Sequence, residues 1–197
     1  MDSMIDYRGR TPDKVDDGVF LVTAKNIRDG IIDYSTSQEF IREDEYQSVM
    51  SRGMPKIGDV LFTTEAPLGQ VSNVDREEIA LAQRVIKFRG LVDHLDNYYL
   101  KYWIMGSPCQ FNLTQLATGS TALGIKGSKI GMVQICLPPI DEQRFIVKYL
   151  NEATAKIDVV LAKTEQAKTL QNEHRTALIS AAVTGKIDVR GTVNGIQ

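Results

Sequence analysis

Cysteine and histidine are scarce in this 197-residue sequence, which contains two of each. Cys109 and Cys136 form no CxxC pair and lie among apolar neighbours, so we expect two reduced core thiols in a cytoplasmic protein and no structural disulfide. His94 and His174 lie far apart in the chain and belong to neither an HExxH nor a GxSxG motif. The sequence therefore indicates no metal site and no hydrolase triad.

Hydrophobic runs long enough to cross a membrane are missing, and so is an excess of positive charge. No apolar stretch approaches ~18 residues and no basic-then-apolar signal segment opens the chain, so we expect no membrane contact. The formal net charge is −2, and residues 1–139 carry more acidic than basic side chains. Because DNA-binding domains normally have a basic surface, any DNA-binding surface here must be a local patch. DNA binding by this chain alone should therefore be weak.

Motifs of catalysis and nucleotide binding are also absent. An amino-methyltransferase holds a flipped base with Asn or Asp before two prolines and an aromatic residue after them, and Leu137-Pro138-Pro139-Ile140 lacks both. The loop 118–129 is rich in Gly, Ser and Thr but matches neither GxxxxGK[ST] nor GxGxxG. We therefore expect a non-catalytic chain that binds no cofactor itself.

The composition that is present is typical of a soluble globular protein, with 43% hydrophobic and 24% charged residues. The length accommodates one ordinary domain with an appendage, or two small domains. In residues 1–138, short apolar runs alternate with polar loops. The predicted elements are a hairpin of 19–23 and 31–34 around a turn at 26–30, a helix from 38 to about 52, strands at 60–63, 70–74 and 85–88, helices at 96–105 and 110–117, and a last strand at 133–137.

The longest uninterrupted segment lies between Pro139 and Gly185 and contains no Pro or Gly. Asp141 and Glu142 place negative charge at the expected helix N-terminus, and Gly185 is a usual helix stop. The segment predicts a helix of about 44 residues, which is about 66 Å long at ~1.5 Å per residue. Alternating steps of four and three residues then give a heptad seam. Its positions are Ile146, Leu150, Ala153, Ile157, Val160, Thr164, Ala167, Gln171, His174, Leu178 and Ala181.

A helical seam of this length favours a partner helix. Most of its residues are apolar or small, and the polar positions Thr164, Gln171 and His174 can set the register of a helix pair. The alternative is one long helix that lies on its own globular domain. The residues that we expect at the helix–helix contact are Ile146, Leu150, Ala153, Ile157, Val160, Ala167, His174 and Leu178.

Four runs in this helical region carry a resemblance to a known family. They are Leu137-Pro138-Pro139-Ile140-Asp141-Glu142-Gln143-Arg144-Phe145-Ile146, Tyr149-Leu150, Ala155-Lys156-Ile157-Asp158 and Leu178-Ile179-Ser180-Ala181-Ala182-Val183-Thr184-Gly185-Lys186-Ile187-Asp188. Together they resemble the conserved region of type I restriction–modification DNA specificity subunits. The resemblance implies that the helix joins two target-recognition domains at a fixed separation. It also implies docking of methyltransferase subunits, which bring S-adenosylmethionine.

Shorter runs in the first part of the chain resemble the target-recognition domains of the same family. They are residues 6–12, 22–30, 58–63 and 82–84 and the loop 118–129. The Trp- and Leu-containing strand that usually opens such a domain is missing, so we expect that the natural protein begins earlier or that this chain is a fragment. Whole specificity subunits contain two recognition units, and one copy here implies a half-subunit, either naturally separate or excised.

The resemblance also indicates which residues contact DNA. Loops on a strand scaffold commonly carry binding residues, Arg pairs with phosphate or guanine, and Asn pairs with adenine. Without the resemblance, the same residues would be interpreted as ordinary solvated loop residues. The candidates are Arg8, Arg10, Lys25, Asn26, Arg28, Thr63, Gln83, Arg84, Thr118, Ser120 and Lys126.

The sequence thus predicts an α+β protein with a mixed or antiparallel sheet. Residues 1–138 would form a DNA target-recognition domain, and residues 139–197 a long coiled-coil-forming helix with a short tail. We expect a homodimer through the helix that binds double-stranded DNA and positions methyltransferase and restriction subunits on a bipartite target. The alternatives are a self-standing enzyme, a coiled-coil oligomer without a DNA role, and an inhibitor that pairs with an intact specificity subunit.

Overall fold

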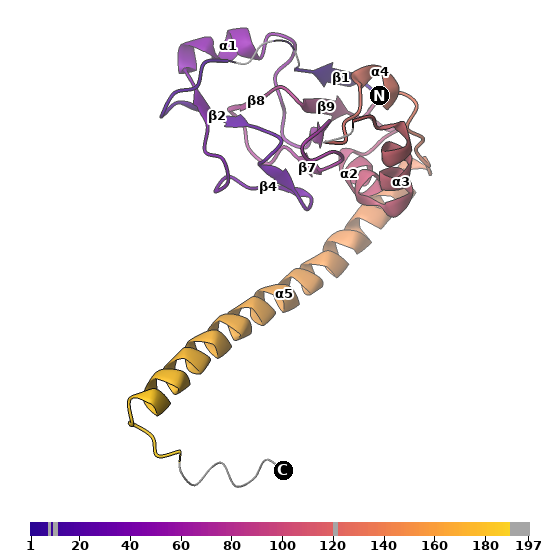
Figure 1. Cartoon of the computed structure of the whole chain (residues 1–197). Coiled ribbons are helices and arrows are strands. Elements are labelled where there is room, and N and C mark those ends of the chain that lie inside the picture. The colour runs from indigo at the N-terminus through magenta and orange to yellow at the C-terminus, as the bar shows by residue number, and fades with distance from the viewer. Residues whose placement is uncertain (8, 10–11, 120–121, 190–197) are drawn as a thin grey trace. The chain divides into compact units, whose positions relative to one another are not determined.

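The computed structural model describes residues 1–7, 9, 12–119 and 122–189. The chain divides into two compact units, Met1–Val147 and a second unit that begins at Lys148. The first unit contains three sheets and several short helices, and the second consists mainly of the helix α5 (Ile140–Val183), as Figure 1 shows. Sheets of mixed pairing followed by one long helix confirm the predicted α+β class.

The main sheet of the first unit is antiparallel and has four strands. Their order is β1 (Ser3–Asp6), β9 (Val85–Arg89), β6 (Val60–Thr63) and β7 (Val71–Asn73). Alternate side chains of a strand point to opposite faces of the sheet. Val60 and Phe62 accordingly join one core cluster while Leu61 joins the other. Because both faces are covered, β6 and β9 are apolar along most of their length, as the sequence predicted.

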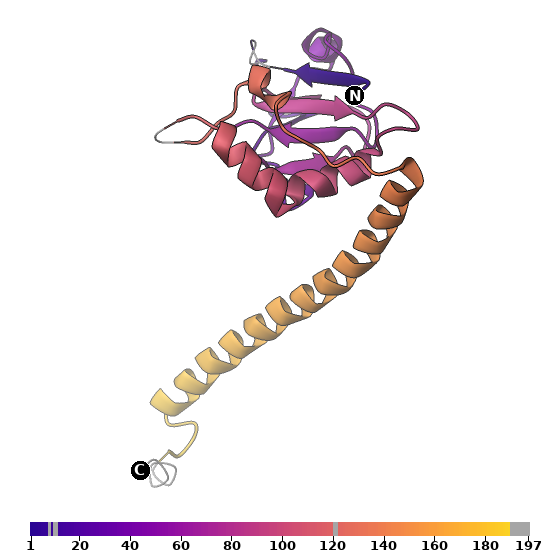
Figure 2. The ribbon, with the colours of Figure 1, turned by 90° about the vertical axis from the view of Figure 1, so that its right-hand side faces the viewer.

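Two helices cover one face of this sheet (Figure 2), namely α2 (Asn97–Met105) and α3 (Ser107–Leu116). Asp96 caps α2, since its Oδ1 accepts from the amides of Tyr98 and Tyr99 at 2.8 and 3.0 Å. Among the aromatic side chains of α2, Tyr99 is buried in the core and Tyr98 is exposed. The short helix α4 (Gly127–Ile130) follows the loop 118–126.

The strand β2 (Val19–Val22) corrects the predicted hairpin. It pairs in antiparallel fashion with β5 (Phe40–Ile41) and in parallel with β8 (Ile79–Leu81), and not with residues 31–34. The hairpin is formed instead by β3 (Ile27–Arg28) and β4 (Ile31–Ile32). Its turn residues Asp29 and Gly30 have φ of 51° and 84°, and positive φ at both positions is what the favoured two-residue hairpin turn requires.

The predicted helix from 38 to about 52 is much shorter in the structure. Phe40 and Ile41 pair with β2, and only the single turns η1 (Glu43–Glu45) and α1 (Tyr46–Val49) are helical. Ile41 and Met50 of this segment are buried. Pairing with a strand distant in sequence has overridden the local helical pattern here.

The predicted last strand at 133–137 is irregular in the described structure. Side chains of α2 hold this segment instead, because Tyr99 Oη donates to the Cys136 carbonyl at 2.8 Å and Trp103 Nε1 donates to the Gln134 carbonyl at 3.1 Å. Both cysteines are free thiols, and Cys109 is buried as predicted. Cys136 is exposed, so its assignment to the core was wrong.

The first turn of α5 belongs to the first unit and is attached to it by Gln143, whose side chain is fully buried. Its Oε1 accepts from the Asp96 amide at 2.9 Å, and its Nε2 donates to the carbonyls of His94 and Pro138 at 2.8 and 2.7 Å. One side chain therefore joins the N-terminus of α2 to the N-terminus of α5. The predicted long helix is confirmed, and its N-terminus at Ile140 follows the Pro138-Pro139 pair as expected.

A charged cluster is buried on the face of the main sheet that carries Leu61, because Lys87 is paired with Leu61 in the sheet register. The Asp59 carboxylate, 1% exposed, accepts from Arg89 Nε and Nη2 at 2.6 Å each and lies 3.3 Å from Nζ of the equally buried Lys87. Burial acts to raise the pKa of Asp59, but the bonds from Arg89 and the Lys56 amide and the charge of Lys87 hold that pKa below its ordinary value. Burial lowers the pKa of Lys87, which the charge of Asp59 opposes.

Candidate nucleic-acid interface

The loop between β6 and β7 is the centre of the candidate interface. Thr63 closes this loop, since its hydroxyl donates to the Pro67 carbonyl at 2.5 Å and accepts from the Gln70 amide at 2.9 Å. A backbone bond from the Gly69 amide to the Thr63 carbonyl at 2.9 Å adds to the closure. Ala66, at the turn, has a positive φ of 48°. The loop is therefore a compact, internally bonded platform on which the neighbouring loops meet.

The segment 23–29 lies against one side of this platform. The Asp29 amide donates to Gln70 Oε1 at 3.1 Å, which ties the β3–β4 turn to the central loop. A cavity of about 440 Å³ between them is lined by Lys25 and Arg28, both exposed, together with Pro67 and Gln70. Two of the predicted DNA-contacting residues therefore lie on one wall of one cavity.

A neighbouring cavity of about 280 Å³ contains Lys25 again, now together with Gln83 and Arg84 from the turn between β8 and β9. Lys14 and Glu39 form an ion pair of 2.7 Å at its wall. Burial acts to raise the pKa of Glu39, yet the Lys14 ammonium and the Ser37 hydroxyl hold it below its ordinary value. Four of the predicted residues (Lys25, Arg28, Gln83 and Arg84) are thus brought together by two separate segments, 23–29 and the β8–β9 turn.

The loop 118–126 approaches the opposite side of the platform. The Ile125 amide donates to the Thr64 carbonyl at 2.9 Å, and Glu65 pairs with Gly124 in an isolated bridge. Thr118 exchanges two backbone bonds with Gly124, and Lys126 is the N-cap residue that precedes α4. Thr118 and Lys126 are exposed on this loop but line neither of the two cavities.

Two predicted DNA-contacting residues have a different place in the structure. Asn26 is fully buried: its Oδ1 accepts from the amide and hydroxyl of Thr23 at 2.9 and 2.8 Å, and its Nδ2 donates to the carbonyls of Asp33, Thr36 and Ser37. Thr63 is also fully buried and bonded within its own loop. Both side chains hold loops in shape, and neither presents a polar atom to a ligand, which corrects the prediction for these two residues.

Three predicted residues, Arg8, Arg10 and Ser120, lie outside the described residues. Sequence reasoning missed Glu65, Gln70, Lys14 and Glu39, which hold or line the cavities. Glu65 and Gln70 lie in the β6–β7 loop, next to the sequence-predicted candidate Thr63. Lys14 and Glu39 had no such signal, because their approach to this loop depends on the β2–β5 pairing.

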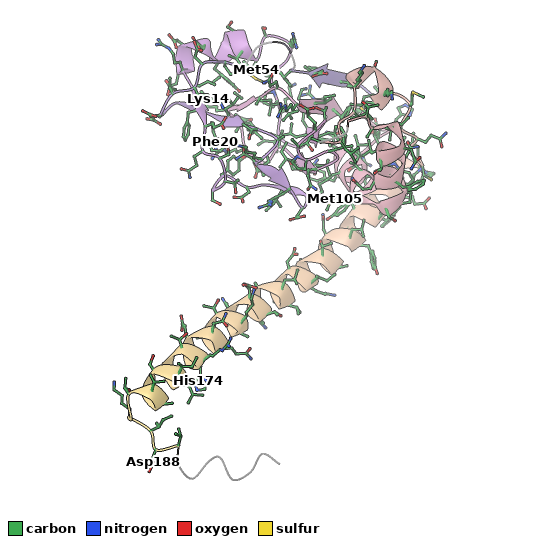
Figure 3. All side chains as sticks on the ribbon, in the orientation of Figure 1. Lys14, Phe20, Met54, Met105, His174 and Asp188 are labelled. Atoms are coloured by element: carbon green, nitrogen blue, oxygen red, sulfur yellow. The ribbon has the colours of Figure 1, made fainter. Side chains whose placement is uncertain are left out.

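The side chains along α5 form the second candidate surface. Ile157, Val160 and Leu178 are 57%, 61% and 51% exposed, and Ala167 and His174 (labelled in Figure 3) are exposed as well. Ile146, Leu150 and Ala153 are half-buried. The predicted seam is therefore largely open to solvent in the described chain.

No described helix is both long and apolar enough to cross a membrane. No group of His, Cys, Asp and Glu side chains within the same residues is arranged to hold a metal ion.

Comparison with known proteins gives one family. The model of the type I restriction modification DNA specificity domain matches residues 22–169. A type I restriction enzyme MjaVIII specificity subunit of Methanocaldococcus jannaschii is 24% identical over 182 residues, which cover 89% of this chain and 41% of that protein. The EcoKI specificity subunit of Escherichia coli (strain K12) is 26% identical over 89 residues, covering 45% of this chain and 19% of that protein. This chain therefore spans less than half the length of these relatives.

Solved structures show the same fold. A structure described as the basis of complex assembly and conformational transition of the type I R-M system superposes with a TM-score of 0.63 at 17% identity, covering 91% of this chain and 42% of that one. The HsdS subunit from Thermoanaerobacter tengcongensis superposes with a TM-score of 0.52 at 19% identity, covering 80% of this chain and 36% of that one.

Proposed function

The chain belongs to the type I restriction modification DNA specificity family, and on this premise we propose that it is a DNA-recognition unit of such a system. Its first unit binds one part of a bipartite target in double-stranded DNA. Its helix α5 pairs with a partner helix and positions methyltransferase and restriction subunits on that DNA. The chain itself is non-catalytic and holds no cofactor, while S-adenosylmethionine is bound by the methyltransferase subunit.

The observation that carries the proposal is the convergence of Lys25, Arg28, Gln83 and Arg84 from separate loops around the β6–β7 loop. Basic and amide side chains of this kind contact phosphates and base edges. Acidic side chains lie among them, including Asp29, so the local positive charge is modest. This supports weak binding by the chain alone and an assembly in which partner subunits add phosphate contacts.

The double variant Lys25→Ala/Arg28→Ala tests the DNA-binding surface. Loss of two phosphate contacts should lower the slope of log K against log salt by about 2 and weaken binding to any duplex sequence. Fluorescence anisotropy with a labelled duplex at several salt concentrations measures this slope. The matched control Arg42→Ala/Lys56→Ala removes two exposed charges that line neither cavity. Equal loss of binding in both double variants would contradict a local DNA-binding surface and favour non-specific attraction.

We propose further that two copies pair through α5, each supplying one half of a specificity subunit. The open seam at Ile157, Val160 and Leu178 supports this, as does coverage of 91% of this chain but 42% of the matched structure. Two-fold pairing would place one recognition unit at each end and select a palindromic target with a fixed spacer.

Light scattering tests the pairing. The wild-type chain should have the mass of a dimer, and Ile157→Asp/Val160→Asp should be a monomer because both charges would be buried in the seam. Val159→Asp is the matched control, since Val159 is 54% exposed on another face of α5. A monomeric wild-type chain would refute the homodimer. It would not bear on the DNA-recognition proposal, which the anisotropy experiment tests separately.

A further inference from the structure

Arg84 is held in an unusual backbone conformation within the candidate interface. Its φ is +76°, a region that residues with a side chain rarely occupy. Two bonds from Thr64 fix this conformation, because the Thr64 amide and hydroxyl both donate to the Arg84 carbonyl, at 2.9 and 3.2 Å. Thr64 is itself buried. The platform loop therefore determines where the Arg84 side chain begins.

The far end of the same side chain is held by Glu65. Arg84 Nε lies 2.5 Å from Glu65 Oε1, and the two side chains are 50% and 43% exposed. Glu65 packs closely against Gly124, where a Cβ would lie only 3.2 Å from Glu65 Oε2 and 3.1 Å from Glu65 Cβ. The arginine is thus fixed at its backbone and at its guanidinium by two adjacent residues of one loop.

The contact at Nε leaves the Nη groups available. A guanidinium has five N–H donors in a planar fork, and four of them are on Nη1 and Nη2. Among the described residues no hydrogen bond to either Nη atom of Arg84 is recorded. Two parallel N–H groups of this kind match the O6 and N7 acceptors of guanine in the major groove.

The Glu65 carboxylate beside Arg84 disfavours binding of a phosphate but not binding of a base edge. A phosphate that approached Arg84 would also approach Glu65, and the net charge of the pair is zero. The uncharged acceptors of a guanine edge meet no such repulsion. A preformed orientation also reduces the side-chain entropy that is lost when the two bonds to a base form. The pair is therefore better suited to a base edge than to the DNA backbone.

We propose that Arg84 is a specificity-determining residue that binds one guanine in the major groove of the target, and that Glu65 is its positioning residue. This inference rests on the proposed function and adds the identity of one recognised base. Arg84 then differs from Lys25 and Arg28, which bind phosphates.

The test is selection of bound duplexes from a random-sequence DNA pool by the full-length chain at low salt, where even weak protein–DNA binding is retained, followed by sequencing. The wild-type chain should enrich sites with a G at one fixed position of each half-site that a recognition unit binds. Arg84→Lys keeps the charge but lacks the fork, so preference for that G over other bases should fall about 5- to 100-fold while the other positions are unchanged. The salt slope of Arg84→Lys should equal that of the wild type.

Glu65→Gln and Arg42→Ala complete the experiment. Removal of the carboxylate at Glu65 should weaken the preference for G and raise the salt slope by about 1, because Arg84 becomes free to bind phosphate. Arg42 forms an exposed ion pair with Asp44 and lines neither cavity, so Arg42→Ala should change nothing. Retained G preference in Arg84→Lys, or uniform weakening at all positions, would overturn the inference alone. A wild-type chain that enriches no sequence would overturn the proposed function as well.

Discussion

Replacement of Asp59 by Asn is expected to destabilise the first unit severely, although the two side chains are nearly the same size. The Asp59 carboxylate is 1% exposed and is bonded to Arg89 Nε and Nη2 at 2.6 Å and to the Lys56 amide at 2.9 Å. Lys87 Nζ, 3.3 Å away, is as deeply buried. Asn keeps one acceptor oxygen but removes the only negative charge that the described structure places in contact with Lys87.

The size of the destabilisation in Asp59→Asn depends on whether the two basic partners of Asp59 can reach water. The Arg89 side chain is 25% exposed and can turn toward solvent, whereas the Lys87 side chain is 2% exposed and cannot. Leaving one charge of a buried pair uncompensated typically costs about 3–5 kcal/mol. Each kcal/mol lowers the melting temperature of a domain of this size by about 2–4 °C. The variant Asp59→Asn should therefore unfold about 6–20 °C below the wild type.

A double-mutant cycle with urea unfolding checks the cause. Lys87→Met removes the buried ammonium while Asp59 keeps its two bonds from Arg89, so its cost should be smaller than that of Asp59→Asn. In the double variant the uncompensated charge is gone, and stability should recover by more than 1 kcal/mol relative to Asp59→Asn. If Asp59→Asn costs less than about 1 kcal/mol, or if the two substitutions are simply additive, the reasoning from an uncompensated charge at Lys87 is refuted.

Three further outcomes are expected. The folded-state pKa of Asp59 lies below its ordinary value of 3.8, so the carboxylate stabilises the fold above pH 3.8 and this stabilisation is lost as the pH falls through the lower folded value. In urea unfolding from pH 6 downward, the free energy of unfolding should therefore fall less steeply in Asp59→Asn than in the wild type. Gln143→Leu should cost about 1–3 kcal/mol by leaving the Asp96 amide and two carbonyls unpaired, while Gln166→Leu on exposed α5 should change stability by less than about 0.5 kcal/mol. Asn26→Ala removes the bonds to Thr23 and Asp33 and should lower the free energy of unfolding by about 1–3 kcal/mol, as measured by thermal unfolding. Reduced DNA binding without any loss of stability would instead identify Asn26 as a DNA contact.

Local signals in the sequence predicted the elements whose limits are set by neighbouring residues. Pro139 and Gly185 bracket α5, and Asp96 caps α2, so both helices lie close to their predicted positions. The elements that were mispredicted depend on distant pairing. Phe40 and Ile41 carry a helical pattern but complete a sheet with β2, and β2 itself pairs with β8, nearly 60 residues later by the register Phe20↔Ile79. Nothing in a local window encodes such a pairing.

Within the candidate site, too, the sequence predicts some side chains correctly, while the place of others depends on contacts that only the fold shows. Asn26 and Arg84 are both polar loop residues of types that bind DNA, and the sequence gives no reason to separate them. Burial separates them, because Asn26 is fully buried and bonded inside its own loop, whereas the Arg84 side chain is 50% exposed and starts from a fixed backbone. Satisfied hydrogen bonds, rather than residue type, distinguish a loop-holding residue from a binding residue.

The net negative charge of the chain is compatible with a DNA-recognition unit, because acidic side chains lie beside the basic residues of the candidate interface. A strongly basic surface would bind every duplex by counterion release, and the differences between sequences would then be a small part of the total affinity. Under the proposed function, Glu65 next to Arg84 and Asp29 next to Arg28 reduce that non-specific part while leaving directional donors in place. Under the proposed function, affinity would come from the partner subunits and selectivity from this chain. Substitution of Glu65 by Gln would then increase binding to random DNA at the expense of discrimination, a combination that a simple structural role for Glu65 does not produce.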